Sequence, residues 1–187
     1  LRPQDKLKLF EVHPTDGRLL TRNVEGLAAG KQVEVLRKNS FDSLKSLLPP
    51  PSRRGLVLMD PSYELKTDYE AVVACVLDAL KRFPTGTFAV WYPVIARPEA
   101  HAMAKKLKTL STQHQRPWVQ AELAVGHTPD GTPVKTGARP ATQMRASGMH
   151  IINPPFTLAA QLREALPLVL SHLKGKVGAG WTVEHGG

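Results

Sequence analysis

Short apolar runs alternate with segments of helical periodicity along most of the chain. Runs rich in valine, isoleucine, leucine and aromatic residues are typical of buried strands, and apolar residues spaced three and four apart are typical of helices with one buried face. We predict strands at residues 8–13, 32–37, 55–60, 87–93, 119–125, 148–153 and 180–184. We predict helices from about residue 15 and at residues 41–48, 67–83, 98–110 and 158–173. This alternation is typical of βαβ units and predicts an α/β fold with a mainly parallel sheet.

Individual segments of the chain refine this prediction of the fold. The run at residues 55–60 is apolar without alternation, which predicts a central strand covered on both faces. Thr15 precedes the first helical pattern, and its hydroxyl is expected to cap that helix. Residues 126–146 lack periodicity, contain several prolines and glycines and carry basic side chains, so they are predicted to form a long basic loop. No internal repeat and no second domain are evident, so residues 1–187 are expected to form one domain.

Composition narrows the class of protein. The chain has 187 residues, 42% of them hydrophobic and 22% charged, which excludes intrinsic disorder over its whole length. The net charge of +9 favours an anionic partner, with nucleic acid first. The single cysteine, Cys75, excludes a disulfide framework and a cysteine-based zinc site, and we expect a buried, inert thiol. The histidines have no metal-ligand spacing, so no metal site is expected.

Cellular context is predicted from the same features. No apolar stretch reaches the roughly 18 residues that a membrane span requires, so no membrane partner is expected. We expect a monomeric protein of a reducing, cytoplasmic compartment. The chain begins at Leu1 and runs almost at once into a strand, which suggests a fragment of a longer polypeptide.

The most informative segment is the tetrapeptide Asp60-Pro61-Ser62-Tyr63, which follows the predicted central strand. Open α/β sheets bind their ligands at the carboxyl ends of such strands. An exocyclic amine of a nucleobase is a poor nucleophile because its lone pair is delocalised into the ring. The Asp60 carboxylate and a proline carbonyl can accept both of its N–H groups, and Tyr63 can stack on the base. The alternative is an ordinary turn before a helix, with Asp60 or Ser62 as a cap.

A second candidate lies downstream. The segment Asn153-Pro154-Pro155-Phe156 also ends a predicted strand and matches the general pattern of amino-methyltransferases even better. Local pattern alone cannot choose between the two tetrapeptides.

Five separate segments, in order, resemble one family, the RlmJ methyltransferases. They are residues 10–14 (Phe-Glu-Val-His-Pro), residues 48–55 (Leu-Pro-Pro-Pro-Ser-Arg-Arg-Gly), residues 60–69 (Asp-Pro-Ser-Tyr-Glu-Leu-Lys-Thr-Asp-Tyr), residues 91–94 (Trp-Tyr-Pro-Val) and residues 147–149 (Ser-Gly-Met) leading into Asn153-Pro154-Pro155. The resemblance covers residues 1 to about 185 and the C-terminal two thirds of the family. It implies a Rossmann-like class I methyltransferase fold that uses S-adenosylmethionine to methylate the N6 atom of an adenine in 23S ribosomal RNA.

The resemblance also implies roles for single residues. Asp60, Pro61 and Tyr63 match the catalytic tetrapeptide, usually Asp-Pro-Pro-Tyr, while the later Asn-Pro-Pro segment has no catalytic role in the family. Glu11 matches the acidic residue that meets the cofactor ribose. Asn39 and Ser40 match an Asp-Gly pair beside the cofactor adenine, and Asp60 also borders the cofactor.

The chain departs from the family in three places. Ser62 replaces the second proline, which we expect to be tolerated, and Asn39 replaces a carboxylate. The family's N-terminal region, with its glycine-rich cofactor loop on the first strand, has no counterpart among these residues. A mixed, seven-stranded type of sheet lacking its first strand is therefore expected, with a gap between the strands that end at Glu11 and Asp60.

Three alternative functions remain open at this point. A DNA adenine methyltransferase and a protein amide methyltransferase share the short motif. A catalytically impaired RNA-binding protein is the rival from another class, because the cofactor loop is absent and Asn39 and Ser62 depart from the family. The expected partner is ribosomal RNA, naked or partly assembled, since the target base must leave its stack to enter a pocket.

Overall fold

The computed structural model describes residues 1–126, 144–173 and 177–187. Its elements in chain order are β1 (Leu7–Phe10), α1 (Pro14–Gly26), the 3₁₀ helix η1 (Gly30–Gln32), β2 (Val33–Leu36), α2 (Ser40–Leu44), β3 (Leu56–Met59), α3 (Lys66–Arg82), β4 (Thr87–Val94), α4 (Pro98–Gln113), β5 (Trp118–Ala124), β6 (Ala146–Ile152), α5 (Leu158–His172) and β7 (Gly180–Gly186). They fall into two compact units, Leu1–Leu48 and Pro49–Gly187, and each is described by itself. A single domain over residues 1–187 stays a prediction. Most of the predicted basic loop at 126–146 lies outside the described residues.

The first unit is a parallel strand pair with its connecting helix. β1 and β2 pair from Leu7 opposite Val33 to Phe10 opposite Leu36, and α1 joins them. The expected cap at Thr15 is wrong: α1 begins at Pro14, with His13 as its N-cap residue. Proline suits a first helical position because it has no N–H, and an N–H there would find no carbonyl partner within the helix. α2 is shorter than the predicted helix at 41–48, because its last turn tightens into bonds such as Leu47 N–H to Leu44 O.

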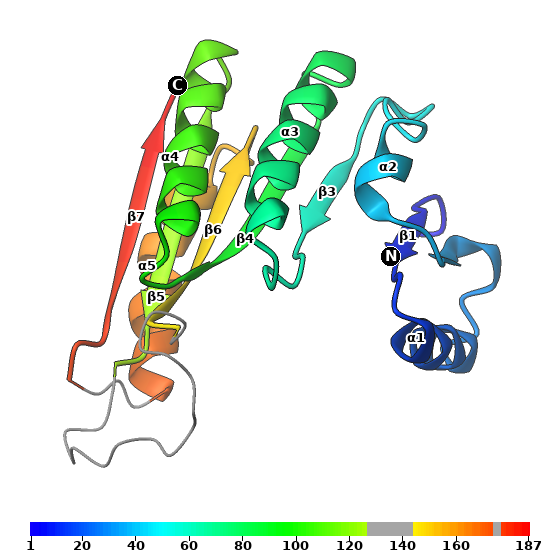
Figure 1. Cartoon of the computed structure of the whole chain (residues 1–187), viewed down its shortest axis with the longest axis horizontal. Coiled ribbons are helices and arrows are strands. Elements are labelled where there is room, and N and C mark those ends of the chain that lie inside the picture. The colour runs from blue at the N-terminus through cyan, green and yellow to red at the C-terminus, as the bar shows by residue number, and fades with distance from the viewer. Residues whose placement is uncertain (127–143, 174–176) are drawn as a thin grey trace. The chain divides into compact units, whose positions relative to one another are not determined.

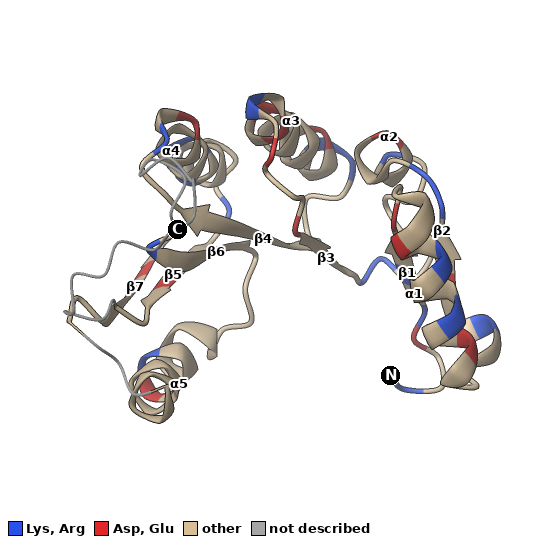
Figure 2. Ribbon diagram, turned by 60° about the horizontal axis from the view of Figure 1, so that its bottom comes forward, with Lys and Arg blue, Asp and Glu red and all other residues tan. Residues whose placement is uncertain are grey.

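The second unit carries a five-stranded sheet in the order β3-β4-β6-β5-β7 (Figure 1). β3 and β4 are parallel, while β6 enters antiparallel between β4 and β5, and β7 pairs antiparallel with β5. The sheet is therefore mixed, and the expectation of a mainly parallel sheet is wrong for this unit. Figure 2 shows α3 and α4 on one face of the sheet and α5 on the other.

β3 is an edge strand of this sheet rather than a central one. Leu56 is 67% exposed and Leu58 63% exposed, so the run that was expected to be covered on both faces is open on one. The physical reason is that β3 pairs with β4 alone within its unit. The core lies one strand further in, where Phe88 and Val90 of β4 are fully buried.

A polar cluster is sealed inside this core. His150 of β6 is fully buried, with Nε2 3.1 Å from the Ser111 hydroxyl oxygen and Nδ1 3.3 Å from Oε1 of Gln120. Its ring stacks on Trp118 at 5.6 Å between centroids. Burial, with the positive charge of Lys108 as a lesser cause, lowers the pKa of His150 to about 3. The imidazole is therefore neutral at physiological pH and acts as a packed polar group of the core.

Acid should unfold the protein partly through this residue. Between pH 6.5 and pH 3 the unfolded chain binds a proton at His150 that the folded chain does not, so stability falls as the pH falls. We expect His150→Gln to remove about 2 kcal/mol of the loss between pH 7 and pH 5, since one pKa unit corresponds to about 1.4 kcal/mol. Urea unfolding of both proteins at the two pH values measures this. Equal losses in the two proteins would contradict the assignment.

Candidate functional site

The predicted catalytic residues form a turn at the carboxyl end of β3. This segment, residues 60–63, is called the 60–63 turn below. Asp60 is exposed, and its carboxylate accepts no hydrogen bond from any residue in the described part of the chain. Pro61 is half-buried and Ser62 is exposed. An acceptor at a strand end is thus open to a ligand, as the pattern of the sequence predicts.

Tyr63 holds the turn in an unusual backbone conformation. Its φ is +54°, a left-handed value that costs a non-glycine residue on the order of 1–3 kcal/mol. Two hydrogen bonds oppose that cost. The Tyr63 hydroxyl donates to the main-chain oxygen of Trp91 at 2.5 Å, and the Tyr63 carbonyl accepts from Nη1 of Arg97 at 3.3 Å. Burial raises the pKa of the Tyr63 hydroxyl, so this group stays protonated and keeps donating.

The Tyr63 ring is packed against other aromatic side chains. It is 4% exposed and lies 4.8 Å from the Tyr69 ring and 6.2 Å from the Trp91 ring, centroid to centroid. A base could stack on Tyr63 only if the side chain turned outward and gave up the bond to Trp91. Nearby, the Tyr69 hydroxyl is buried and has no hydrogen-bond partner among the described residues.

Asn153 lies at the other edge of the sheet. β6 runs antiparallel to β4, with Ile152 opposite Phe88, so the carboxyl end of β6 meets the amino end of β4. There the Asn153 amide donates to the carbonyls of Pro84, at 2.9 Å, and Gly86, at 2.7 Å. Both amide hydrogens are used in structural bonds, and Phe156 of the same motif is fully exposed. Strand direction thus separates the two similar tetrapeptides.

The predicted cofactor residues Glu11, Asn39 and Ser40 belong to the first unit. Glu11 directly follows β1, and its main-chain N–H donates to the oxygen of Leu36 at the end of β2. One oxygen of the Glu11 carboxylate accepts from the His13 main-chain N–H at 2.7 Å, and the other has no partner among the described residues. The Asn39 side chain caps α2 by accepting from Phe41 N–H at 2.9 Å. The ends of the two strands therefore bring Glu11 and Asn39 to one edge.

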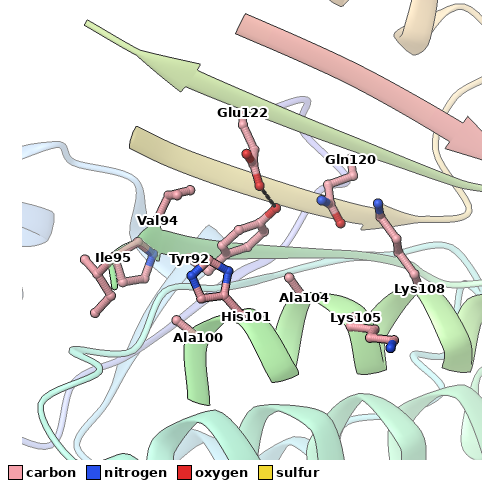
Figure 3. A pocket seen from close by; sticks show the side chains of 11 residues that line it. Tyr92, Val94, Ile95, Ala100, His101, Ala104, Lys105, Lys108, Gln120 and Glu122 are labelled. Atoms are coloured by element: carbon pink, nitrogen blue, oxygen red, sulfur yellow. Dashed lines mark hydrogen bonds between the residues drawn. The ribbon is translucent and has the colours of Figure 1, made fainter. Parts of the chain in front are cut away.

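A cavity of about 250 Å³ lies between α4 and the sheet of the second unit (Figure 3). Its floor is the Tyr92 ring, which crosses Gly148 of β6 and donates through its hydroxyl to Glu122 of β5 at 2.9 Å. A Cβ atom at residue 148 would lie 2.3 Å from this ring, so only glycine leaves room for the crossing. Two of its polar side chains already have partners: Glu122 accepts from Tyr92, and Lys108 pairs with Glu184 at 2.5 Å.

Two residues of this region carry no sequence signal of a role. Arg97 precedes Pro98, and a position before a helix-starting proline indicates only a helix boundary. Glu122 reads as a charged residue within a strand. The described residues contain no cluster of three potential metal ligands, and none of their helices is long and apolar enough to span a membrane.

Comparison with known proteins decides the family. A family model described as "Ribosomal RNA large subunit methyltransferase D, RlmJ" matches residues 1–185. The chain belongs to the RlmJ family.

Two curated members of the RlmJ family are each 42% identical to the chain. Both are ribosomal RNA large subunit methyltransferase J, one from Haemophilus influenzae, over 98% of this chain and 60% of that protein, and one from Escherichia coli K12, over 92% and 56%. The chain thus spans less than two thirds of these relatives. A crystal structure of a Legionella pneumophila protein superposes with a TM-score of 0.81 at 30% identity, over 100% of this chain and 62% of that one. The α/β fold with a mixed sheet and the methyltransferase family are therefore as predicted.

The two positions of the Asn153 motif should respond differently to truncation. Asn153→Ala removes two hydrogen bonds, one of them partly buried, and we expect it to lower the free energy of unfolding by about 1–3 kcal/mol. Phe156→Ala removes a ring that is fully exposed in the described structure, and we expect no measurable change. Urea unfolding of both variants checks this. A loss of stability in Phe156→Ala equal to that in Asn153→Ala would be inconsistent with the structural role given to Asn153.

Gly148 should be similarly intolerant of a side chain. A methyl group there overlaps the Tyr92 ring, and overpacking of this kind costs about 1–3 kcal/mol. Gly180, at the start of β7, has no atom within 4 Å of an added Cβ and supplies the matched control. We expect Gly148→Ala to lower the thermal midpoint while Gly180→Ala leaves it nearly unchanged. Equal midpoints would show that the Tyr92 ring can move aside.

Proposed function

We propose that the protein transfers a methyl group from S-adenosylmethionine to the N6 atom of an adenine in 23S ribosomal RNA. The observation that carries this proposal is the 60–63 turn, whose Asp60 carboxylate at a strand end has no hydrogen-bond partner among the described residues, in a chain of the RlmJ family. The names of the two relatives support a ribosomal RNA substrate. The net charge of +9 is consistent with a phosphate-rich partner.

The residues proposed for the cofactor have suitable chemistry. Glu11 keeps one carboxylate oxygen for the ribose hydroxyls, which are hydrogen-bond donors. Asn39 and Ser40 would face the cofactor adenine, where the Asn39 amide can both donate and accept. Asp60 is proposed as a further cofactor contact. When bound, S-adenosylmethionine supplies an electrophilic methyl group on a sulfonium.

Asp60 and Pro61 would act on the adenine amine. The Asp60 carboxylate and the Pro61 carbonyl accept its two N–H groups, which draws the nitrogen lone pair away from the ring and towards the methyl group. The nitrogen would form its bond to the methyl carbon as the carbon–sulfur bond breaks, with the bonding pair going to sulfur. The surplus proton would leave the amine for solvent water during or after the transfer. No metal is required by this scheme.

Tyr63 would stack on the target base after the base has left its helix. Its ring is buried in the described structure, so the proposal includes an outward rotation of this side chain when RNA binds. The bond from the Tyr63 hydroxyl to Trp91 would break in that rotation.

Substitution of Asp60 tests the proposal. Asp60→Ala removes the acceptor, and we expect kcat for methyl transfer to ribosomal RNA to fall about 100- to 1000-fold. Asp60→Asn keeps a carbonyl acceptor but loses the charge, and we expect a smaller loss, roughly tenfold. Because the carboxylate is exposed and has no hydrogen-bond partner in the described part of the chain, neither variant should change the thermal midpoint. Mass spectrometry of nucleosides from the digested RNA identifies the product as N6-methyladenosine.

The same assay distinguishes the proposed function from the alternative functions. Competition with DNA and with protein would reveal a different preferred substrate, and RNA binding without cofactor binding or methyl transfer would indicate an RNA-binding protein. Asn153→Ala serves as the control, because it alters the similar tetrapeptide at the opposite edge. Full activity in Asp60→Ala would falsify the proposed role of the turn.

A further inference from the structure

Arg97 contacts the 60–63 turn from a different loop. Its Nη1 donates to the carbonyl oxygen of Tyr63 at 3.3 Å, across the space between the loop after β3 and the loop after β4. Tyr63 has a left-handed backbone conformation, and no main-chain N–H among the described residues donates to this carbonyl. A carbonyl on a nearly buried residue requires a partner, and the guanidinium supplies one.

Arg97 is itself held in place. Its main-chain N–H donates to the oxygen of Ile95 at 2.8 Å, and Ile95 is buried. Arg97 is the N-cap residue of α4 and precedes Pro98, so its backbone has little freedom. Two residues later, Glu99 pairs with Lys66 at 2.8 Å, and this ammonium lowers the pKa of Glu99. A second link therefore joins the beginnings of α3 and α4.

We infer that Arg97 is a positioning residue, whose guanidinium fixes the Tyr63 main chain so that Asp60 and Pro61 keep the orientation needed for methyl transfer. The inference rests on the proposed function. Among the described residues no side chain donates a hydrogen bond to Asp60 or Pro61, and the peptide of Tyr63 is part of the link between them and α3. When the Tyr63 ring leaves Trp91 to meet a base, the bond from Arg97 is the attachment that remains. Arg97 therefore matters most while the substrate is bound.

This role predicts that substitution of Arg97 lowers kcat and leaves the binding of ribosomal RNA nearly unchanged. Misplacement of reacting groups by about 1 Å can cost about 100-fold in rate. We expect Arg97→Gln to lower kcat about 10- to 100-fold, with KM for ribosomal RNA changed less than about threefold. Arg97→Lys should restore part of the loss, because an ammonium can still donate to one carbonyl. Arg82→Gln is the matched control: it removes the same charge at the far end of α3, where Arg82 pairs with Asp78.

Two other measurements identify what Arg97 does. In nitrogen–proton spectra, the amide of Glu64, which follows the bonded carbonyl, should shift in Arg97→Gln and not in Arg82→Gln. The dependence of RNA affinity on salt should be the same in Arg97→Gln and in the unsubstituted protein. A raised KM with a salt slope smaller by about 0.7 would overturn the inference, because it indicates a contact with RNA phosphate. An unchanged kcat per folded molecule would also overturn it.

These measurements distinguish a failure of this inference from a failure of the proposed function. If the unsubstituted protein methylates no ribosomal RNA, the proposed function fails. The Glu64 amide then still reports whether Arg97 orders the turn. A shift supports that ordering, and an unmoved amide overturns it.

Discussion

The direction of β6 is the constraint on which the second unit depends. This strand lies antiparallel between β4 and β5, so its carboxyl end faces the amino ends of its neighbours. Asn153 consequently reaches the loop before β4, and its amide serves carbonyls there. Asp60 follows a parallel strand and ends at the opposite edge with an open carboxylate. Two tetrapeptides with nearly the same letters thus have different chemistry because their strands point in opposite directions.

The same strand explains why a glycine lies opposite a large aromatic residue in the sheet. Gly148 has no side chain, so Tyr92 of β4 can lie across β6 and reach Glu122 of β5. One tyrosine thereby connects three strands through a contact and a hydrogen bond. Burial raises the pKa of the Tyr92 hydroxyl, so the hydroxyl stays protonated and donates this hydrogen bond. The Trp-Tyr-Pro-Val and Ser-Gly-Met segments are far apart in sequence and meet at this crossing.

The sequence predicted most elements, because periodicity and flanking prolines are local properties. The helix at 67–83 and the strand at 87–93 each match within a residue or so. The pairing partner of a strand is not a local property, so the prediction of a central strand at residues 55–60 was wrong. The composition of this run suits a strand covered on both faces, whereas β3 lies at an edge of the sheet. For the candidate site, the sequence placed the Asp60 tetrapeptide at the end of a strand, but local pattern could not choose between it and the Asn153 tetrapeptide. The left-handed backbone of Tyr63 and the arginine that supports it depend on loops brought together by the fold, and no spacing in the sequence indicates them.

The hydrogen bond from the Tyr63 hydroxyl to Trp91 has a consequence for the motions of the turn. An exposed loop ordinarily samples conformations within nanoseconds to microseconds. Here the acceptor belongs to β4, whose neighbouring side chains are fully buried, and such strands open only with large parts of the core. The Tyr63 side chain is therefore tethered to a buried strand, and its rotation out of the resting state requires this one bond to break while the bond from Arg97 to the Tyr63 carbonyl remains. Its movement should be an all-or-none event with its own rate constant, rather than a continuous drift of a flexible loop.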